Sequence, residues 1–440
     1  MFRVAAVALL LAAPALAQSV APPSIPEVDA PELAKLGAAA VGVRTLTLVN
    51  RDQPDVLATD PKTGVVPRHD RSLKVDIFYP AQASQAARVT YRAAMTAEPP
   101  LPPVAFSVPG IAVENAKPAP GRYPLVVLSH GYGNATAALT WLTENLASKG
   151  YVVAAIRHDD PDIADRAKFV GPLINRPRDI AFAAASLRKQ LPDLIDPTRT
   201  ALIGYSMGGY GVLTVAGAAI DQAGMLAKGV PGGELVTLAR NPAALQVAGL
   251  KAVVAISPFG GNGLDIWGSD GLAGVSVPLL FIAGNRDKVV GYDKGAAGFF
   301  AATPRADRYL LTFREAGHSI GLNPAPAEMT STLWDFDWFE DAVWRKRRIN
   351  AINQHFITAF LARTLKGEAA MAAYLDVPVV NSDDGVWPVT PGSPDAVPRY
   401  AGYSPGSGGV TVWKGFLKGH ATGLELRHAG AGQTLTRSAE

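Results

Sequence analysis

The sequence predicts an α/β fold in which a mostly parallel central sheet is covered by helices on both faces. From residue 123 onward, short apolar runs typical of buried strands alternate with longer helical stretches, the pattern of parallel strands joined by helices. The chain of 440 residues is 48% hydrophobic and 18% charged, so it can bury a large core and is not mainly disordered.

The first 39 residues are expected to precede the folded domain. Arg3 is followed by an apolar run that ends at Ala17 in a small-x-small pattern, which is typical of a secretory signal peptide. An uncleaved anchor is the alternative, but the run is shorter than the roughly 20 residues of a membrane span. We therefore expect residues 1–17 to be a signal peptide and the mature chain to be periplasmic or secreted, without a transmembrane segment. Residues 18–39 are rich in Pro and Ala and form a loose lead-in.

One folded domain is expected over residues 40–376. Two strands with alternating apolar residues open it, and residues 80–120, rich in Ala and Pro, are predicted to form a variable connection. The predicted strands are 41–49, 73–79, 125–128, 151–156, 200–203, 253–256, 279–282 and 309–313, with helices at 137–149, 179–190 and 207–219.

Two segments depart from the strand–helix alternation. Residues 220–249 form an insertion that is either a cap over a pocket or a surface excursion, since long loops are often functional but need not be. Residues 377–440 are again rich in Pro, Gly and Ser, with a short apolar patch at 410–416. We interpret them as a C-terminal extension that packs on the domain.

Composition excludes several classes of function. The 41 basic and 38 acidic side chains nearly balance, so there is no electrostatic reason to expect a nucleic-acid partner. Cysteine is absent, which removes disulfides, thiolate metal sites and cysteine nucleophiles. Asp159, Asp160 and Asp162 follow a strand, but no wider His or carboxylate cluster supports a hard-ion site. We expect a solvated acidic loop there, no metal and no other cofactor.

A G-x-S-x-G pattern, Gly204-Tyr-Ser206-Met-Gly208, lies between an apolar strand and a helix. In this setting the serine sits on a sharp strained turn with its hydroxyl exposed, and small residues on either side prevent crowding. The bare pattern is common in a chain with 43 glycines. Its position at a strand–helix junction is what identifies Ser206 as a candidate nucleophile.

A nucleophilic serine needs a base and a group that orients the base, in the chain order nucleophile, acid, histidine for this type of site. His318 lies five residues past the strand that ends at residue 313, at the sheet edge where such active sites lie. Asp287 follows the preceding strand, 279–282, and Asp293 is its nearest rival. We predict Ser206, Asp287 and His318 as the catalytic residues.

An oxyanion hole requires two backbone N–H donors. One is expected from Met207, directly after the nucleophile, and the other from the loop after the strand 125–128. That loop reads Ser129-His-Gly-Tyr-Gly133, where the glycines free the backbone to turn. Tyr132 is the predicted second donor, and His130 is expected to structure the loop.

Over about residues 70–320 the chain resembles an α/β-hydrolase of the group that includes platelet-activating-factor acetylhydrolase, dienelactone-hydrolase-like proteins and bacterial cutinases. The resemblance implies the α/β-hydrolase fold, the same triad and the same two oxyanion donors. Two departures stand out. Dienelactone hydrolases use a cysteine nucleophile, which this chain lacks, and small cutinases end soon after their histidine, whereas this chain continues for about 120 residues. The matching stretches are residues 123–133, 146–153, 204–209 and 277–287.

The function expected from these observations is an exported serine hydrolase that cleaves carboxylic esters through an acyl-enzyme. Small-molecule, lipid and polyester (cutinase-like) substrates stay open, as do an acyltransferase or a peptidase with the same triad. A non-catalytic binding protein would show a broken triad or no oxyanion loop. The oligomeric state does not follow from the sequence.

Three weaker signals have structural interpretations beside functional ones. Trp267 either walls a substrate pocket or plugs the core. The aromatic residues within 334–344 are expected to pack an amphipathic helix, although some of them could wall a pocket. Arg176-Pro-Arg-Asp179 is similar to a stretch in the dienelactone-hydrolase-like proteins, and we expect a structural role for it.

Overall fold

The computed structural model describes residues 31–98, 101–386, 409–416 and 421–435. The described strands form one 11-stranded sheet in the order β11-β10-β9-β8-β7-β5-β6-β2-β1-β4-β3. The six strands from β6 to β10 in this order are mutually parallel, as the sequence predicts. They are β5 (Tyr123–Ser129), β6 (Val152–Arg157), β7 (Ile195–Tyr205), β8 (Leu250–Ile256), β9 (Leu279–Gly284) and β10 (Arg308–Phe313).

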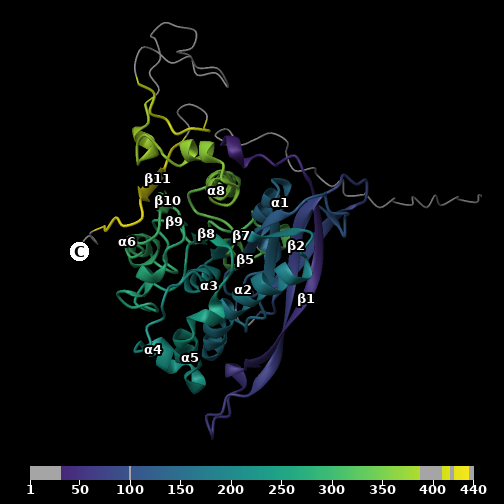
Figure 1. Cartoon of the computed structure of the whole chain (residues 1–440), viewed down its shortest axis with the longest axis vertical. Helices are drawn as coiled ribbons and strands as arrows, with labels where there is room; N and C mark the ends of the chain where they lie inside the picture. Colours follow the sequence, from purple (N-terminus) through teal and green to yellow (C-terminus); the bar gives the residue numbers. More distant parts are fainter. Residues whose placement is uncertain (1–30, 99–100, 387–408, 417–420, 436–440) are drawn as a thin grey trace, which may run out of the picture.

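Helices cover both faces of this sheet (Figure 1). Alternate side chains of β5 point to opposite faces, so Val127 joins one core cluster and Val126 the other. The first cluster contains apolar residues of α2, α3, α4, α5 and α6, and the second those of α1 and α8. The helices are α1 (Thr140–Ser148), α2 (Val170–Gln190), α3 (Met207–Val215), α4 (Met225–Gly229), α5 (Glu234–Arg240), α6 (Gly298–Ala301), α7 (Leu333–Asp337) and α8 (Lys346–Leu361).

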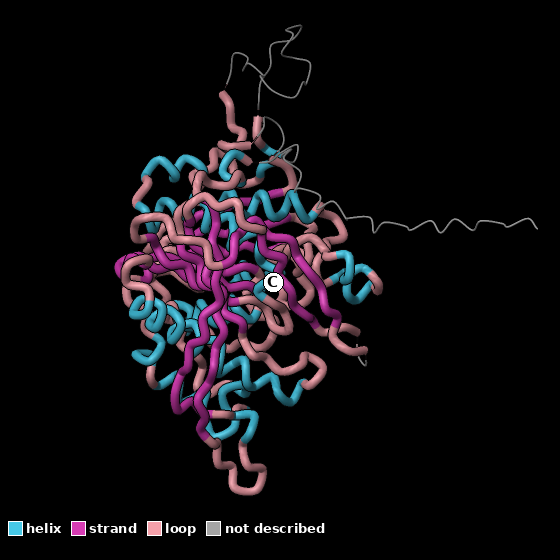
Figure 2. The backbone as a smooth tube through the Cα atoms, turned by 90° about the vertical axis from the view of Figure 1, so that its right-hand side faces the viewer, coloured by secondary structure: helices cyan, strands magenta, loops and turns pink. Residues whose placement is uncertain are grey.

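The N-terminal part of the sheet is antiparallel except where β1 pairs with β4, and it is longer than predicted. β1 (Ala40–Pro54) pairs antiparallel with β2 (Arg68–Ala81), which pairs antiparallel with β6. The expectation that residues 80–120 form only a variable connection is wrong, because they supply β3 (Arg88–Met95) and β4 (Val104–Glu114). These strands form the sheet edge, where Pro109 and small side chains are tolerated, so their composition hid them. The paired long strands β1 and β2 extend beyond the body of the molecule in Figure 2.

The insertion at 220–249 packs beside α2. Leu235 and Leu238 of α5 are buried in the core, and Glu234 forms an ion pair with Arg178 of α2, at 3.4 Å. Arg188, near the end of α2, donates to the carbonyl of Ala248. These contacts extend the helical layer, which favours the surface excursion over the cap. In Figure 1, α4 and α5 lie at the opposite end of the molecule from α8.

Both terminal segments dock on the domain where they are described. The lead-in makes hydrogen bonds from Leu33 N to His355 Nδ1 of α8 (3.2 Å) and from Glu32 N to Gly415 O (2.7 Å). The C-terminal extension adds β11 (Leu424–Ala429), antiparallel to β10. Residues 1–17, the expected signal peptide, lie outside the described residues. Among the described residues, no helix is both long enough and apolar enough to cross a bilayer.

The extension contributes a large apolar side chain to the core. Trp413 is 1% exposed, packs edge-on against Phe356 of α8, and donates from Nε1 to the carbonyl of Val379 at 2.8 Å. We expect Trp413→Ala to lower the free energy of unfolding by about 3–5 kcal/mol, because it opens a cavity and leaves that carbonyl unpaired. Urea unfolding measures this, with the exposed Val410→Ala as control. A loss below about 1 kcal/mol would contradict the docking of the extension.

Candidate active site

The serine of the G-x-S-x-G pattern sits at the end of β7 in a strained conformation. Ser206 has φ 53° and ψ −116°, outside the ordinary regions for a residue with a side chain. A Cβ on Gly204 would lie 2.2 Å from the carbonyl oxygen of Gly208, and a Cβ on Gly208 would lie 2.0 Å from that of Ser129. Both positions therefore require glycine. The turn is held by Ser206 N donating to the carbonyl of Ile256, at 2.9 Å.

The predicted histidine and carboxylate meet this serine in one chain of contacts. His318 Nε2 lies 3.1 Å from Ser206 Oγ, and His318 Nδ1 lies 2.7 Å from Asp287 Oδ2. A hydrogen on Nδ1 that bonds to the carboxylate leaves Nε2 as the acceptor for the serine hydroxyl. The three side chains come from the carboxyl ends of β7, β9 and β10, which meet at one edge of the sheet.

The surroundings of Asp287 stabilise its ionised carboxylate. Its Oδ1 accepts from the backbone N–H groups of Val289 and Val290, at 2.9 and 3.0 Å. Burial opposes the charged form, but the hydrogen bond and charge of His318, together with these two N–H donors, lower the pKa of Asp287 overall. Asp293, the rival candidate, is exposed at the start of the following short helix.

The loop that carries His318 is fixed by residues that the sequence did not single out. Tyr205 donates from its hydroxyl to the carbonyl of His318 at 3.2 Å. Asp341 Oδ2 accepts from Gly317 N at 2.7 Å, and Lys346 donates to the carbonyl of Ser319. Burial lowers the pKa of Lys346 to about 8. Only the tertiary fold brings the segment around residues 341–346 to this loop.

The two predicted oxyanion donors lie on segments that touch each other. Met207 begins α3, so its N–H has no acceptor one turn earlier in the helix. The loop with Tyr132 lies against this helix start, as the close approach of Ser129 O to Gly208 shows. Gly133 has φ 68°, which glycine adopts without strain.

Aromatic side chains form a row from this loop to the residues beside Ser206. Tyr132 packs edge-on against Phe169 (5.4 Å between ring centroids), and Phe169 packs edge-on against Phe259 (5.5 Å). All three side chains are half-buried. Phe259 N donates to the carbonyl of Ser206 at 2.9 Å, so this aromatic row begins beside the nucleophile.

Trp267 is not part of that surface. It is 3% exposed, donates from Nε1 to Thr214 Oγ1 at 3.2 Å, and packs on Tyr210 and Phe299. The structure therefore corrects the pocket assignment of Trp267 and supports its interpretation as a core plug. Trp338, in the aromatic segment after His318, would lie 3.7 Å from a Cβ on Gly133, and so approaches the oxyanion loop.

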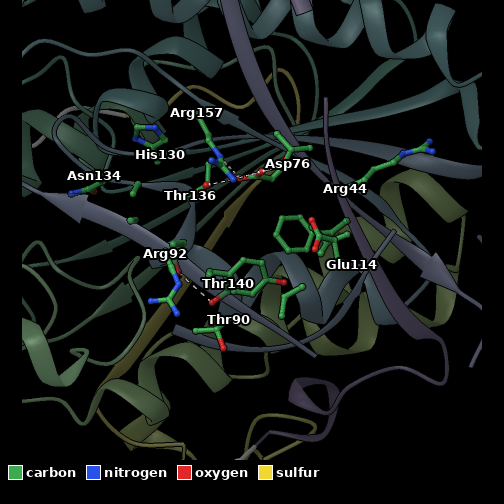
Figure 3. A pocket seen from close by; sticks show the side chains of 18 of the residues that line it. Arg44, Asp76, Thr90, Arg92, Glu114, His130, Asn134, Thr136, Thr140 and Arg157 are labelled. Carbon is green, nitrogen blue, oxygen red and sulfur yellow. Dashed lines mark hydrogen bonds and ion pairs between the residues drawn. The ribbon is translucent and has the colours of Figure 1, made fainter. Parts of the chain in front are cut away.

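A cavity of about 490 Å³ lies beside the site but does not contain the triad. It is bounded by β1, β2 and β3 on one side and by His130 and Asn134 of the oxyanion loop on the other (Figure 3). Asp76 and Arg157 in its wall form an ion pair at 2.6 Å, to which Thr136 also donates. Asp76 also accepts from Thr45 Oγ1 at 2.7 Å, whereas Arg44 Nε and Asn134 Nδ2 in this wall are buried without a hydrogen-bond partner among the described residues.

A buried polar network lies beneath the oxyanion loop. His158 Nδ1 bonds to Asp179 Oδ2 at 2.9 Å, and Ser129 Oγ lies 2.9 Å from His158 Nε2. Asp179 is also held by both ends of the Arg71 guanidinium, at 2.8 and 2.9 Å. Asp160, one of the acidic-loop residues, pairs with Arg176. Among the described residues, no group of three or more His, Asp or Glu side chains could hold a metal ion.

This network predicts loss of stability in acid. Burial lowers the pKa of His130 to about 4 and that of His158 well below 6.5, with the charge of Arg176 lowering both further. Below pH 6.5 these two histidines bind protons in the unfolded chain but stay neutral in the folded chain. The free energy of unfolding therefore falls as pH falls toward 4. The slope approaches about 1.4 kcal/mol per pH unit for each histidine. Urea unfolding at pH 7.5, 5.5 and 4.5 measures it. Unchanged stability across this range would contradict the neutral, buried state of both rings.

Comparison with known proteins agrees with the fold. Residues 112–231 match the family model of PET hydrolase-like proteins. A solved ferulic acid esterase from Streptomyces cinnamoneus aligns with a TM-score of 0.50 and 21% identity, covering 77% of this chain and 94% of that one. The chain has the α/β-hydrolase fold.

Curated relatives of this α/β-hydrolase include bacterial cutinases. Cutinase 1 of Thermobifida cellulosilytica is 28% identical over 186 residues, which cover 41% of this chain and 55% of the relative. Cutinase est1 of Thermobifida alba is 26% identical over 201 residues, covering 44% and 53%. The chain thus spans about half the length of the curated relatives it matches. These similarities relate the chain to bacterial cutinases and to PET hydrolase-like proteins.

The family match covers only part of the site of this α/β-hydrolase. Residues 112–231 include the oxyanion loop, α2 and Ser206, but neither Asp287 nor His318. The contacts from Asp287 to His318 and from His318 to Ser206 are observed in the geometry of this chain.

Proposed function

We propose that this α/β-hydrolase is a serine esterase that hydrolyses carboxylic esters. The observation that carries the proposal is the unbroken series of contacts from Asp287 through His318 to Ser206 Oγ, at 2.7 and 3.1 Å. The similarity to proteins named as cutinases supports the same conclusion. A non-catalytic binding protein would have no need for this assembled series or for the strain at Ser206.

The proposed reaction proceeds through an acyl-enzyme. His318 Nε2 takes the proton of Ser206 as Oγ attacks the ester carbonyl, and Asp287 stabilises the imidazolium that forms. The N–H groups of Tyr132 and Met207 bind the tetrahedral oxyanion. His318 then protonates the departing alcohol as the ester C–O bond breaks. A water, deprotonated by His318, attacks the acyl-serine and releases the acid with Ser206 restored.

The aromatic row beside Ser206 favours esters with an apolar acyl or alcohol part. Tyr132, Phe169 and Phe259 offer half-buried ring surface, which an apolar group would cover. Polyester hydrolysis is the second candidate, and the match to PET hydrolase-like proteins is the observation that favours it. An acyltransferase or peptidase would use the same triad with a different acceptor or leaving group.

Three assays test these functions and distinguish between them. Initial rates on p-nitrophenyl esters from acetate to laurate measure ester hydrolysis and size the acyl site. Release of soluble acid from an amorphous polyester film measures polymer cleavage. Added alcohol that diverts the acyl group into a new ester without loss of total turnover would indicate an acyltransferase. No hydrolysis of any ester would contradict the esterase proposal.

The proposed function includes export of the protein from the cytoplasm. We propose that residues 1–17 direct secretion and are removed after Ala17. Expression of the full chain in a bacterial host, followed by fractionation and intact-mass measurement of the product, tests this. A mature product that retains residue 1 would contradict cleavage.

A further inference from the structure

The Arg176 side chain is fully buried directly beneath the oxyanion loop. It belongs to α2 and is 0% exposed. A guanidinium has five N–H donors, and Arg176 uses as many hydrogen bonds. Its Nε and Nη2 donate to the two carboxylate oxygens of Asp160. Its Nη1 donates to Ser129 Oγ at 3.1 Å and to the carbonyl of His130 at 2.5 Å. Its Nη2 also donates to the carbonyl of Gly131, at 3.0 Å.

The bond to the Gly131 carbonyl has a consequence for Tyr132. The C=O of Gly131 and the N–H of Tyr132 belong to one planar trans peptide, so they point in opposite directions. Fixing the oxygen toward Arg176 therefore fixes the N–H of Tyr132 to point away from Arg176. His130 Nδ1 (2.7 Å) and Asn134 N (3.3 Å) also bond to this oxygen.

The other hydrogen bonds of the network agree with one assignment of the ring hydrogens of His130 and His158 and of the Ser129 hydroxyl hydrogen. If His130 donates from Nδ1, its Nε2 is the acceptor for His158 N, at 3.3 Å. If His158 donates from Nδ1 to Asp179, its Nε2 accepts from the hydroxyl of Ser129. The hydroxyl oxygen of Ser129 is then free to accept from Arg176. Every donor in this series meets an acceptor with both imidazoles neutral.

The helix that carries Arg176 is joined to the helix that follows Ser206 at a proline. Pro177 lies inside α2 and has no N–H to bond the carbonyl of Leu173 one turn earlier. The hydroxyl of Tyr210, on the helix that follows Ser206, donates to this carbonyl at 2.8 Å. On the same side, a Cβ on Gly211 would lie 3.3 Å from Arg176 Cβ. The Arg-Pro pair thus ties α2 to the nucleophile helix while the guanidinium reaches the loop.

We propose that Arg176 is a positioning residue for catalysis: by holding the carbonyls of His130 and Gly131, it aims the Tyr132 N–H at the developing oxyanion. This proposal rests on the proposed esterase function. Lysine cannot replace the arginine, because an ammonium has three donors and no planar fork.

The test compares Arg176→Lys with Arg71→Gln. Arg71 is a second buried guanidinium of the same network, but its hydrogen bonds go to Asp179 and not to the loop carbonyls that Arg176 holds. Rates on p-nitrophenyl butyrate are divided by the number of active sites, counted with a p-nitrophenyl phosphonate that reacts stoichiometrically. Inhibition by butaneboronic acid, which forms a tetrahedral adduct with the serine, is measured for each variant.

We expect Arg176→Lys to lower kcat per counted site by about 10- to 100-fold, with KM changed less than about threefold. The inhibition constant of the boronic acid should rise by a similar factor, while Arg71→Gln changes both little. A purely structural role would lower the number of active sites and leave kcat per site intact, and that result would overturn the proposal.

A second variant covers the case in which Arg176→Lys does not fold. Asp160→Asn keeps the shape of the partner and weakens its hold on the guanidinium. We expect a smaller fall in kcat per site, again matched by weaker boronic acid binding, and an unchanged kcat would overturn the proposal. A wild-type chain that cleaves no ester, or a Ser206→Ala variant as active as wild type, would instead contradict the esterase function.

Discussion

Ser206→Ala is expected to lower kcat for p-nitrophenyl ester hydrolysis by about 10⁴-fold or more. The variant loses the hydroxyl oxygen that lies 3.1 Å from His318 Nε2. The oxyanion donors and the aromatic row remain, so the ester should still bind and KM should change little. The strained turn is expected to be no less stable, because alanine removes a hydroxyl and adds no atom.

The control is Ser331→Ala, an exposed serine in the loop before α7. Its kcat should equal that of the wild type. A fluorophosphonate probe should add its mass to the peptide that contains Ser206 in the wild type and to no peptide in Ser206→Ala. Equal ester hydrolysis by Ser206→Ala and wild type would remove Ser206 as the nucleophile.

The sequence predicts the parallel strands well because each is a short continuous apolar run, buried on both faces. It fails where burial is one-sided or where pairing is distant. β3 alternates between exposed and half-buried positions at the sheet edge, and its Ala and Pro neighbours resemble a loop. β11 is recruited to β10 from more than a hundred residues further along the chain, beyond the strand–helix alternation that identifies the other strands.

The candidate triad is predictable because each member follows the end of a strand, and those ends meet at one edge. The buried residues that hold the oxyanion loop are not predictable in the same way. Arg176 and Asp160 come from α2 and from the segment after β6, and only the fold brings them under the oxyanion loop. Trp267 shows the same limit, because one aromatic residue in a loop carries no signal that separates pocket wall from core.

Asp287→Asn is the prediction that separates the assigned carboxylate from its rival. We expect kcat to fall by about 10³- to 10⁴-fold. Asp287 Oδ1 is held by two backbone N–H donors, so an asparagine keeps its amide oxygen there and turns its NH₂ toward His318 Nδ1. The imidazole must then accept at Nδ1 and carry its hydrogen on Nε2, where it cannot take the proton of Ser206.

Asp293→Asn is the matched control, since Asp293 is exposed and is the candidate that the sequence could not exclude. It should keep kcat within about twofold of the wild type, because exposed substitutions away from a site change little. The loss in Asp287→Asn should fall on kcat and not on KM, since the ester itself does not contact the carboxylate. If Asp293→Asn loses activity and Asp287→Asn does not, the orienting carboxylate is Asp293 and the loop after β9 must rearrange when substrate binds.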